Sequence, residues 1–327
     1  MKKFLSIVLA AAMLVSVASL VACDTQKDDS KYTVGVVQLV QHVALDAATQ
    51  GFIDAVKAGL GEENVTILNE NASNDPNTCT TIVNNFVSKN VDLIMANATP
   101  ALQAAVNGTT SIPVLGTSIT EYGVALGIDN FDGLVGGNVS GTSDLAPLDE
   151  QAKMLVDLFP DAETVALLYC SSEPNSKYQV EEIRRQLVSL GIADANIKDY
   201  AFTDSNDVVT VAAKAAEADV IYVPTDNTAA SCTETINGVI GGTPLIAGES
   251  GICSGCGVAT LSIDYYDLGV ATGKMAVKIL KGEAKINEMK IEYSAEFAKK
   301  YNAEKCKELG IDVKALEAKG YVAIETE

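Results

Sequence analysis

Short apolar strands alternate with amphipathic helices along nearly the whole chain, and this alternation is the feature that most limits the fold. A strand is predicted over residues 33–37, and the helix that follows, over 44–60, has Ala48, Phe52 and Val56 at four-residue spacing. Further strands are predicted at 65–68, 91–96, 112–115, 164–169, 198–202, 220–223, 245–248 and 258–263. Such alternation predicts an α/β fold with parallel sheets that helices cover on both faces. Two consecutive sets of these units predict two doubly wound lobes in a chain of 327 residues.

The first 31 residues have the pattern of a bacterial export sequence. Two lysines precede an apolar stretch over 4–22, which is also long enough to span a bilayer. The stretch ends in Leu-Val-Ala followed by Cys23, which resembles the lipobox of bacterial lipoproteins. The resemblance implies cleavage just before Cys23 and acylation of its thiol. We therefore predict a signal peptide over 1–22, a lipidated tether over 23–31, and an extracytoplasmic protein that is lipid-anchored to the cell membrane.

Charge and motif content exclude several classes of function. The chain has 43 acidic and 23 basic side chains, a formal net charge of −20, and would repel a nucleic-acid backbone. His42 is the only histidine, and the sequence contains neither a GxSxG nucleophile elbow nor a GxGxxG nucleotide loop. We therefore expect a binding protein and no enzyme, with no cofactor, no metal and no nucleic-acid partner.

Six cysteines follow Cys23, and two of them form the sequence Cys253-Ser-Gly-Cys256. A thioredoxin-like redox pair would open a helix after a strand, whereas the flanking glycines here predict a loop that leads into the strand at 258–263. A zinc site would need a second cysteine pair or paired histidines, which the sequence lacks. Free thiols or one local disulfide are therefore expected, and the pairing of Cys232, Cys253 and Cys256 stays open.

Polar residues follow most of the predicted strands, at the positions where open α/β sheets bind their ligands. These strand-end turns are residues 38–42, 97–99, 117–118, 171–173, 225–227 and 249–250. The only two arginines fall well inside a predicted helix, so a bound anion would be held by helix N-termini and hydroxyl groups. Glu173, Asp226 and Glu249 are suited to a ligand ammonium group. The set fits a zwitterion, although Thr99 or Asp226 alone could also be no more than a helix cap.

Six segments of the chain, four of which include strand-end turns, carry a resemblance to a known family. They lie at residues 38–48, 92–101, 143–145, 169–176, 223–227 and 263–269, with Asn-Ala-Thr-Pro at 97–100 and Ser-Ser-Glu-Pro-Asn-Ser at 171–176. Together they resemble the ABC transporter substrate-binding lipoproteins that include tryptophan- and tyrosine-binding members. The resemblance implies a type I periplasmic-binding fold, in which two Rossmann-like lobes are joined by three crossing strands, here near 141–146, 261–264 and 285–289. It places residues 32–142 and 263–287 in the N-terminal lobe, and residues 143–262 and 288–327 in the C-terminal lobe.

The strand ends and the resemblance together predict a set of ligand-binding residues. The strand ends contribute Gln41, His42, Ala98, Thr117 and Glu249, although the stretch around Glu249 departs from the family pattern. The resemblance implies pocket roles for Thr99, Ser143, Asp144, Ser172, Glu173, Asn175, Ser176, Asp226, Asn227 and Asp264. By chemistry we assign Thr99 and the turn at 175–176 to the ligand carboxylate, and Asp226 with Glu173 to the ammonium group.

These assignments predict a monomeric receptor that delivers an amino acid to an ABC importer. The family implies an aromatic ligand, tryptophan, tyrosine or phenylalanine, and Tyr178, Tyr222 or Tyr265 would wall its ring. Ligand binding would close the hinge, because some contacts form only in the closed state. The closed form would dock on a membrane permease driven by a cytoplasmic ATPase. The alternative is a surface sensor or adhesin that reuses the same ligand-binding fold.

Overall fold

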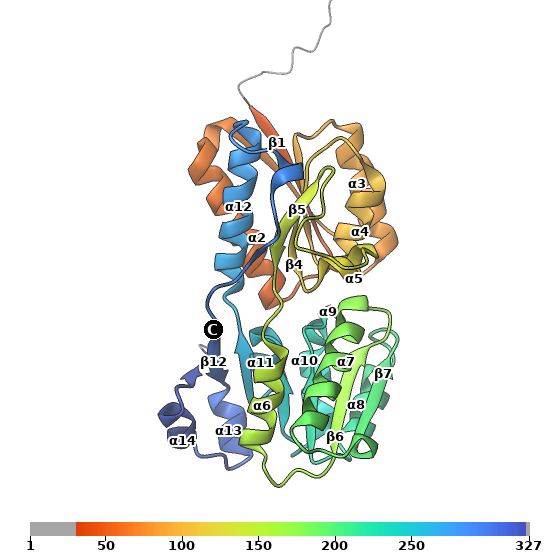
Figure 1. Cartoon of the computed structure of the whole chain (residues 1–327), viewed down its shortest axis with the longest axis vertical. Helices are drawn as coiled ribbons and strands as arrows, with labels where there is room; N and C mark the ends of the chain where they lie inside the picture. Colours follow the sequence, from red (N-terminus) through yellow and green to blue (C-terminus); the bar gives the residue numbers. More distant parts are fainter. Residues whose placement is uncertain (1–30, 325–327) are drawn as a thin grey trace, which may run out of the picture.

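Two α/β lobes, one above the other, form the part of the chain that the computed structural model describes, residues 31–324 (Figure 1). The predicted signal peptide, Cys23 and the tether up to residue 30 lie outside the described residues. Within residues 31–324, every helix is too short or too polar to cross a lipid bilayer. Each lobe is built on one largely parallel sheet, which confirms the α/β fold class predicted from the alternation of strands and helices.

The first lobe has a six-stranded sheet whose neighbouring strands are all parallel, in the order β2-β1-β3-β4-β5-β11. Its strands are β1 (Tyr32–Gln38), β2 (Val65–Asn71), β3 (Leu93–Asn97), β4 (Val114–Ile119), β5 (Val139–Ser143) and β11 (Glu292–Tyr293). Its helices are α2 (Val43–Leu60), α3 (Pro76–Ser88), α4 (Thr99–Gly108), α5 (Tyr122–Leu126) and α12 (Tyr265–Leu280), with short 3-10 helices η1 (Glu62–Asn64) and η3 (Ile286–Glu288). The central strands β3 and β4 are buried along their whole length, because helices cover both faces and an apolar core lies on each side.

Helix α12 returns to the first lobe from late in the sequence and packs along α2 (Figure 1). Glycines permit this close approach. A Cβ atom at Gly51 would collide with the carbonyl oxygen of Tyr266, and one at Gly269 would collide with the carbonyl oxygen of Ala48. The packing of α2 against α12 therefore joins the start of the first lobe to a segment that comes after most of the second lobe in the sequence.

The second lobe has a seven-stranded sheet in the order β7-β6-β8-β9-β10-β12-β13, in which only β10 and β12 pair antiparallel within the described residues. Its strands are β6 (Val165–Cys170), β7 (Ile197–Phe202), β8 (Val220–Val223), β9 (Leu245–Ala247), β10 (Ala259–Ser262), β12 (Ala298–Tyr301) and β13 (Val322–Ala323). Its helices are α6 (Leu148–Leu158), α7 (Pro174–Ser189), α8 (Val208–Ala215), α9 (Asn227–Ser231), α10 (Thr233–Ile240), α11 (Ser250–Cys256), α13 (Ala303–Glu308) and α14 (Val313–Ala318), with the 3-10 helix η2 (Asp194–Asn196). Apolar cores again lie on both faces of the sheet.

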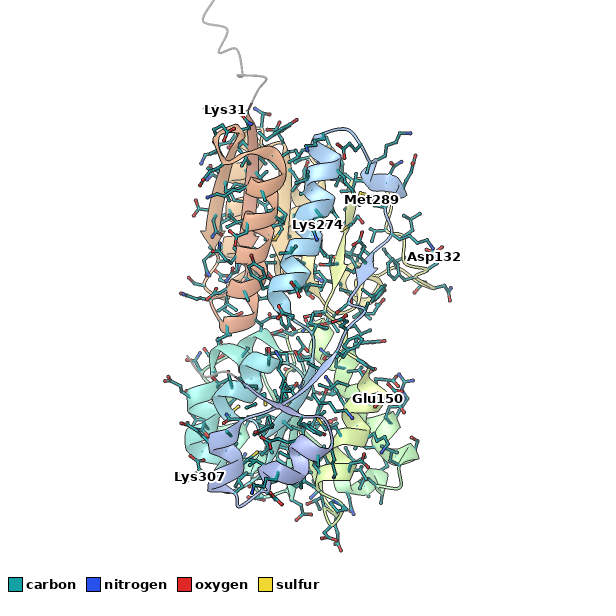
Figure 2. The ribbon with its side chains drawn as sticks, turned by 90° about the vertical axis from the view of Figure 1, so that its left-hand side faces the viewer. Lys31, Asp132, Glu150, Lys274, Met289 and Lys307 are labelled. Carbon is teal, nitrogen blue, oxygen red and sulfur yellow. The ribbon has the colours of Figure 1, made fainter. Side chains whose placement is uncertain are left out.

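The chain passes between the two sheets after β5, after β10 and after β11. The first two passages lie within or next to the predicted crossings, but the third follows Tyr293, later than the predicted 285–289. Glu292 and Tyr293 pair with Thr142 and Ser143 of β5, which keeps this segment in the first sheet. Met289, whose carbonyl accepts a hydrogen bond from Ser140 at 3.0 Å, also lies beside the first lobe (Figure 2). Residues 288–293 therefore belong to the first sheet and its surroundings, and the predicted boundary at 288 is corrected.

The segment that holds Cys253 and Cys256 is helix α11, so the predicted loop is wrong. Glu249 caps this helix by accepting the N–H groups of Gly251 and Ile252, and Ile252 packs in the core with both cysteines. A buried apolar face with a good cap outweighs the low helix propensity of the glycines. The cysteines within the described residues are free thiols, and burial raises the pKa of Cys256 to about 12. The buried pair therefore lacks the thiolate character of a redox site.

Candidate ligand-binding site at the lobe interface

The carboxyl ends of the parallel strands in both sheets meet at the interface between the lobes. Strand β5 leads directly into the second lobe and β10 leads back into the first, so the strands parallel to them end at the same interface. The lobes are in contact here, because the side-chain amide of Asn74 donates a hydrogen bond to the hydroxyl of Thr228 at 3.2 Å. The turns selected from the sequence are therefore placed at one interface.

Asp144 is a buried carboxylate at the rim of the first sheet. It follows β5 and is 3% exposed. Its Oδ2 accepts a hydrogen bond from the hydroxyl of Tyr265 at 3.0 Å, whereas Oδ1 has no hydrogen-bond partner within residues 31–324. Burial raises the pKa of Asp144 to about 6, and the hydroxyls of Tyr265 and Thr120 partly offset this rise. A cation that reaches Oδ1 would meet a carboxylate already removed from water.

The neighbouring ends of β3 and β4 have a backbone conformation that side chains other than glycine rarely adopt. Ala98 has φ 84° and ψ 157°, and Ser118 has φ 54°. The N–H of Ala98 donates to the carbonyl of Thr117 at 3.1 Å, so the two turns are adjacent. The Oγ of Ser118 is buried and has no hydrogen-bond partner in the described part of the chain. Strained backbone of this kind is concentrated at functional sites.

Helix α4 presents its N-terminus at the same rim. Its Ncap residue is Ala98, whose methyl group cannot accept a hydrogen bond, and its second residue is Pro100. The N–H groups of the first turn of a helix have no partner inside the helix, and the helix dipole places partial positive charge at this end. Thr99, the first residue of the helix, is 2% exposed. The turn can therefore hold a small anion without a basic side chain.

His42 stands at the start of α2, at the rim after β1. Both ring nitrogens are buried and have no hydrogen-bond partner that meets normal geometry among residues 31–324. Burial lowers the pKa of His42 to about 4, and the nearby side chain of Asn227 from the second lobe opposes this effect. The imidazole is therefore neutral at pH 7, with one nitrogen able to donate and the other able to accept.

Asn175 faces this rim from the second lobe, at the start of α7. Its Nδ2 donates to the carbonyl of Thr225 at 3.1 Å, whereas its Oδ1 has no partner within the described residues. The hydroxyl of Thr225 lies beside that of Tyr265, which in turn bonds Asp144. Four side chains at this interface have buried polar atoms that lack partners: Asp144 (Oδ1), Ser118 (Oγ), His42 (both ring nitrogens) and Asn175 (Oδ1). We name these groups the open polar row.

Glu173 and Asp226, to which we assigned a ligand ammonium group, instead bond to the protein. Glu173 accepts hydrogen bonds from the N–H groups of Asn227 and Thr228, at 3.1 and 2.9 Å, and from both of their side chains, each at 2.8 Å. Asp226 accepts the N–H of Ala229 at 2.8 Å and that of Cys170 at 2.6 Å. The oxygens of both carboxylates are therefore used to hold the start of α9, which is the capping role that the sequence left open for Asp226.

Glu249 is also a cap. Its two oxygens accept the N–H groups of Gly251 and Ile252 at the start of α11. Burial raises the pKa of Glu249 to about 7, and these two N–H groups partly oppose the rise. Burial and the nearby Glu173 carboxylate likewise raise the pKa of Asp226.

The structure brings some of the predicted residues together at the buried interface and places others elsewhere. His42, Ala98, Thr99, Asp144, Asn175 and Asn227 lie in or next to the open polar row. Thr117 bonds to Thr142 and Thr272 inside the first lobe, and Ser143 donates to the carbonyl of Thr120 at 2.8 Å. Ser176 supports the Asp226 carboxylate. These three side chains position neighbouring segments.

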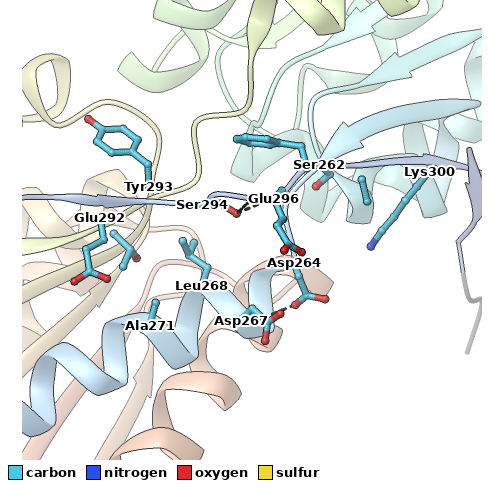
Figure 3. Close-up of a pocket in the computed structure, with 13 residues that line it drawn as sticks. Ser262, Asp264, Asp267, Leu268, Ala271, Glu292, Tyr293, Ser294, Glu296 and Lys300 are labelled. Carbon is cyan, nitrogen blue, oxygen red and sulfur yellow. Dashed lines mark hydrogen bonds between the residues drawn. The ribbon is translucent and has the colours of Figure 1, made fainter. Parts of the chain in front are cut away.

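Three predicted side chains are exposed. Ser172 donates to the carbonyl of Thr203 at 3.0 Å, away from the open polar row. Asp264 caps α12 by accepting the N–H of Asp267 at 3.0 Å, and it lines a pocket of about 350 Å³ on the crossing strands (Figure 3). Gln41 lines a groove of about 570 Å³ between the lobes. Tyr222, a candidate wall for an aromatic ring, is instead in the core of the second lobe, with its hydroxyl on Gln151.

Two residues of the candidate site, Ser118 and Tyr265, were missing from the predicted binding set. Ser118 lies in a strand-end turn that the sequence did indicate, but its unusual φ and its free hydroxyl depend on the packing of its neighbours. Tyr265 had been considered only as an aromatic wall, and its hydrogen bond to Asp144 spans two crossings that are far apart in the sequence.

Comparison with known proteins identifies relatives along almost the whole described chain. The family described as ABC transporter substrate binding protein matches residues 33–317. The tyrosine-binding protein of Clostridioides difficile (strain R20291) is 34% identical over 304 residues, which cover 86% of this chain and 85% of that protein.

Solved structures agree with this result. The ABC domain in complex with L-Trp from Streptococcus pneumoniae is 32% identical, with a TM-score of 0.82, and the match covers 89% of this chain and all of that one. The ligand-free, open structure of a substrate-binding protein with adhesive properties from Clostridium difficile is 36% identical, with a TM-score of 0.68, and the match covers 90% of this chain and all of that one. The resemblance found in the sequence is confirmed, and the chain belongs to the family of ABC transporter substrate-binding proteins.

Proposed function

We propose that this protein captures an aromatic amino acid between its lobes and delivers it to an ABC importer. The observation that carries the proposal is the open polar row, in which one carboxylate, one hydroxyl, one neutral imidazole and one amide oxygen are buried at the lobe interface with unused hydrogen-bonding capacity. Buried polar groups in proteins are nearly always hydrogen-bonded. A polar ligand at this interface would supply the missing partners.

Asp144 is the group we assign to the ligand ammonium. Glu173, Asp226 and Glu249 already accept hydrogen bonds from helix N-termini, whereas Asp144 keeps one oxygen available. An ammonium at this oxygen would form a charge-assisted hydrogen bond in a site with little water. It would also lower the pKa of Asp144, because a nearby positive charge favours the ionised carboxylate.

The ligand carboxylate is assigned to the start of α4 and to Ser118. The first-turn N–H groups of α4 and the Ser118 hydroxyl are donors on adjacent strand ends, next to the rim that holds Asp144. A carboxylate at a helix N-terminus is stabilised by both the N–H groups and the helix dipole. The geometry therefore provides complementary partners for the two ends of a zwitterion.

Two relatives support an aromatic side chain on the ligand, since one is a tyrosine-binding protein and the other was solved in complex with L-Trp. The phenol ring of Tyr265 lies beside Asp144 and is 5% exposed, so it offers an aromatic surface at the proposed ammonium site. This chain superimposes better on the L-Trp complex than on the ligand-free open relative, although its sequence is more similar to the latter. The lobe arrangement described here therefore fits a closed, ligand-holding state.

Delivery to a permease and anchoring through Cys23 belong to the same proposal. Substrate-binding proteins of ABC transporters work outside the cytoplasm. A lipid on Cys23, followed by a short polar tether, would keep the receptor at the membrane face where a permease opens. Metabolic labelling with a fatty-acid probe would test the anchor, and Cys23→Ala should lose the label.

Titration calorimetry of the purified protein with each of the twenty amino acids tests the ligand assignment. Heat from tryptophan, tyrosine or phenylalanine, with affinity in the micromolar range or tighter, is expected. Because the chain contains no tryptophan, energy transfer from its eleven tyrosines to bound tryptophan gives an independent reading. An absence of binding for all three aromatic amino acids would contradict the assignment.

A second candidate function is adhesion, because one solved relative at 36% identity is described as having adhesive properties. Uptake of labelled amino acid and attachment to host cells, measured in the same deletion strain, would separate the two functions. Loss of uptake alone supports transport, and loss of attachment alone supports adhesion.

A further inference from the structure

The groove of about 570 Å³ between the lobes opens beside His42, at one end of the open polar row. The polar side chains that line it come from both lobes and are Gln41, His42, Ser231, Thr233, Glu234 and Ser254. Except for Glu234, these groups are neutral hydrogen-bond donors and acceptors at pH 7. Gln41 is exposed, so the groove reaches the solvent.

The open polar row is longer than a single amino acid. Along the first sheet it runs from Asp144 after β5, past Ser118 near the end of β4 and the start of α4 after β3, to His42 after β1. These four adjacent strands are separated by three spacings of about 4.8 Å, which makes about 14 Å. A free aromatic amino acid spans roughly 9 Å from its ammonium nitrogen to the far end of its ring, as ordinary bond lengths require.

The two ends of the row differ in access. Asp144 is 3% exposed and lies behind Tyr265, which is 5% exposed, so a chain extended from the ligand amino group would have no room there. At the other end His42 borders the solvent-reaching groove. One additional residue in extended conformation adds about 3.5 Å. Its amide group suits the neutral donors and acceptors around His42, and its terminal carboxylate would lie where the groove reaches the solvent.

We infer that the site also accepts short peptides whose first residue is aromatic, with the amino group at Asp144 and the chain beyond the first residue lying in the groove beside His42. This inference rests on the proposed function and widens its ligand class. Peptides extended at the amino end are excluded by the same geometry, because their ammonium group cannot reach Asp144 while the aromatic residue keeps its place.

Calorimetry with matched dipeptides tests the inference. The probes are L-tyrosine and L-tryptophan, the dipeptides tyrosylglycine and tryptophylglycine, and the reversed glycyltyrosine and glycyltryptophan. For at least one of the two aromatic residues, the dipeptide with the aromatic residue first should bind within tenfold of the free amino acid. The reversed dipeptide should bind at least 100-fold more weakly.

Two variants locate the extended part of the ligand. Ser254→Phe fills the groove from the second lobe, and Val43→Phe fills it from the exposed edge of the first lobe. Each should weaken dipeptide binding at least tenfold and change the affinity for the free amino acid less than twofold, which also shows that the variant is folded. The control is Ser189→Phe on α7, because Ser189 and Ser254 both sit in helices and donate to the carbonyl three residues earlier, at 2.7 and 2.9 Å. Ser189→Phe should change neither affinity.

The outcomes separate this inference from the proposed function. Binding of free aromatic amino acids without binding of either dipeptide that begins with an aromatic residue overturns the inference and leaves the proposed function in place. Equal binding of the forward and reversed dipeptides, or dipeptide binding that neither groove variant weakens, also overturns it. No binding of any aromatic amino acid rejects the proposed function and the inference together.

Discussion

The buried carboxylates at the rims of the two sheets differ in how many of their oxygens are already bonded. On the second sheet, Glu173, Asp226 and Glu249 accept backbone N–H groups at the starts of α9 and α11. On the first sheet, Asp144 accepts a hydrogen bond from Tyr265 and keeps one oxygen that has no hydrogen-bond partner of normal geometry within residues 31–324. One rim uses its charges to hold the fold, and the other keeps a charge that we assign to a ligand.

This difference shows why burial and a raised pKa do not by themselves identify a binding carboxylate. Burial raises the pKa of Asp144, Asp226 and Glu249 alike. What distinguishes Asp144 is the number of hydrogen-bond donors already in place. A capping carboxylate is satisfied by the protein in the absence of ligand, whereas Asp144 is fully satisfied only when a cation arrives.

Substitution of Asp144 by Asn should have the largest effect on binding. The amide keeps the size of the side chain but removes the charge that faces the ligand ammonium. We expect a loss of affinity of about 3 kcal/mol or more, on the order of 100-fold, in titration calorimetry. The thermal stability of the ligand-free protein should stay the same or rise, because an incompletely paired buried charge is removed.

The matched control for this substitution is Asp264→Asn. Asp264 is an exposed aspartate on another segment that crosses between the lobes, and it lines the pocket of Figure 3. Its replacement should change the affinity less than twofold. Equal losses in both variants would mean that the binding groups on the two crossings have been assigned wrongly.

Substitution of Glu173 by Ala tests the other side of the comparison. It removes the acceptor for two N–H groups and two side chains at the start of α9. The free energy of unfolding should fall by about 2 to 3 kcal/mol in urea denaturation, because these donors become buried without a partner. The exposed cap of α3 serves as the control, and Asp75→Ala should cost about 1 kcal/mol. A Glu173 variant that is as stable as the native protein but binds ligand much more weakly would show that Glu173 contacts the ligand and does not stabilise the fold.

The fold was predictable because it depends on periodic patterns, whereas the roles of single carboxylates depend on neighbours that are distant in sequence. Apolar runs such as 33–37 and 220–223 show their strands directly. Glu173 could not be recognised as a cap, because the helix that it caps begins at Asn227, more than fifty residues later. The helix at 250–256 was not predicted for a related reason. The Glu249 cap and the packing of Ile252, Cys253 and Cys256 in the core stabilise it, whereas its glycines alone indicate a loop.

The pH dependence of binding should reveal the charge state of Asp144. The pKa of Asp144 is about 6 in this structure, so the carboxylate is ionised at pH 7 and mostly protonated at pH 5. Ammonium binding requires the ionised form, and affinity should therefore fall about tenfold between pH 7 and pH 5. Asp144→Asn should remove this dependence, because the remaining buried carboxylates accept hydrogen bonds at helix starts and are not assigned to the ligand. A pH dependence that persists in Asp144→Asn would assign the titration to another group, of which Glu249 is the first candidate, since its pKa is about 7.

The smallest expected effect concerns the backbone of the first rim. Ala98 holds φ 84° and ψ 157°, a conformation that costs on the order of 1 kcal/mol or more for alanine and is readily adopted by glycine. Ala98→Gly should therefore raise the free energy of unfolding by about 1 kcal/mol. Its affinity for ligand should stay within threefold, because the N–H groups of α4 keep their positions. This result would show that the backbone of the first rim is strained at Ala98. If Ala98→Gly is instead less stable than the native protein, the positive φ is not a source of strain, and the contrast between a strained binding rim and a satisfied capping rim is lost.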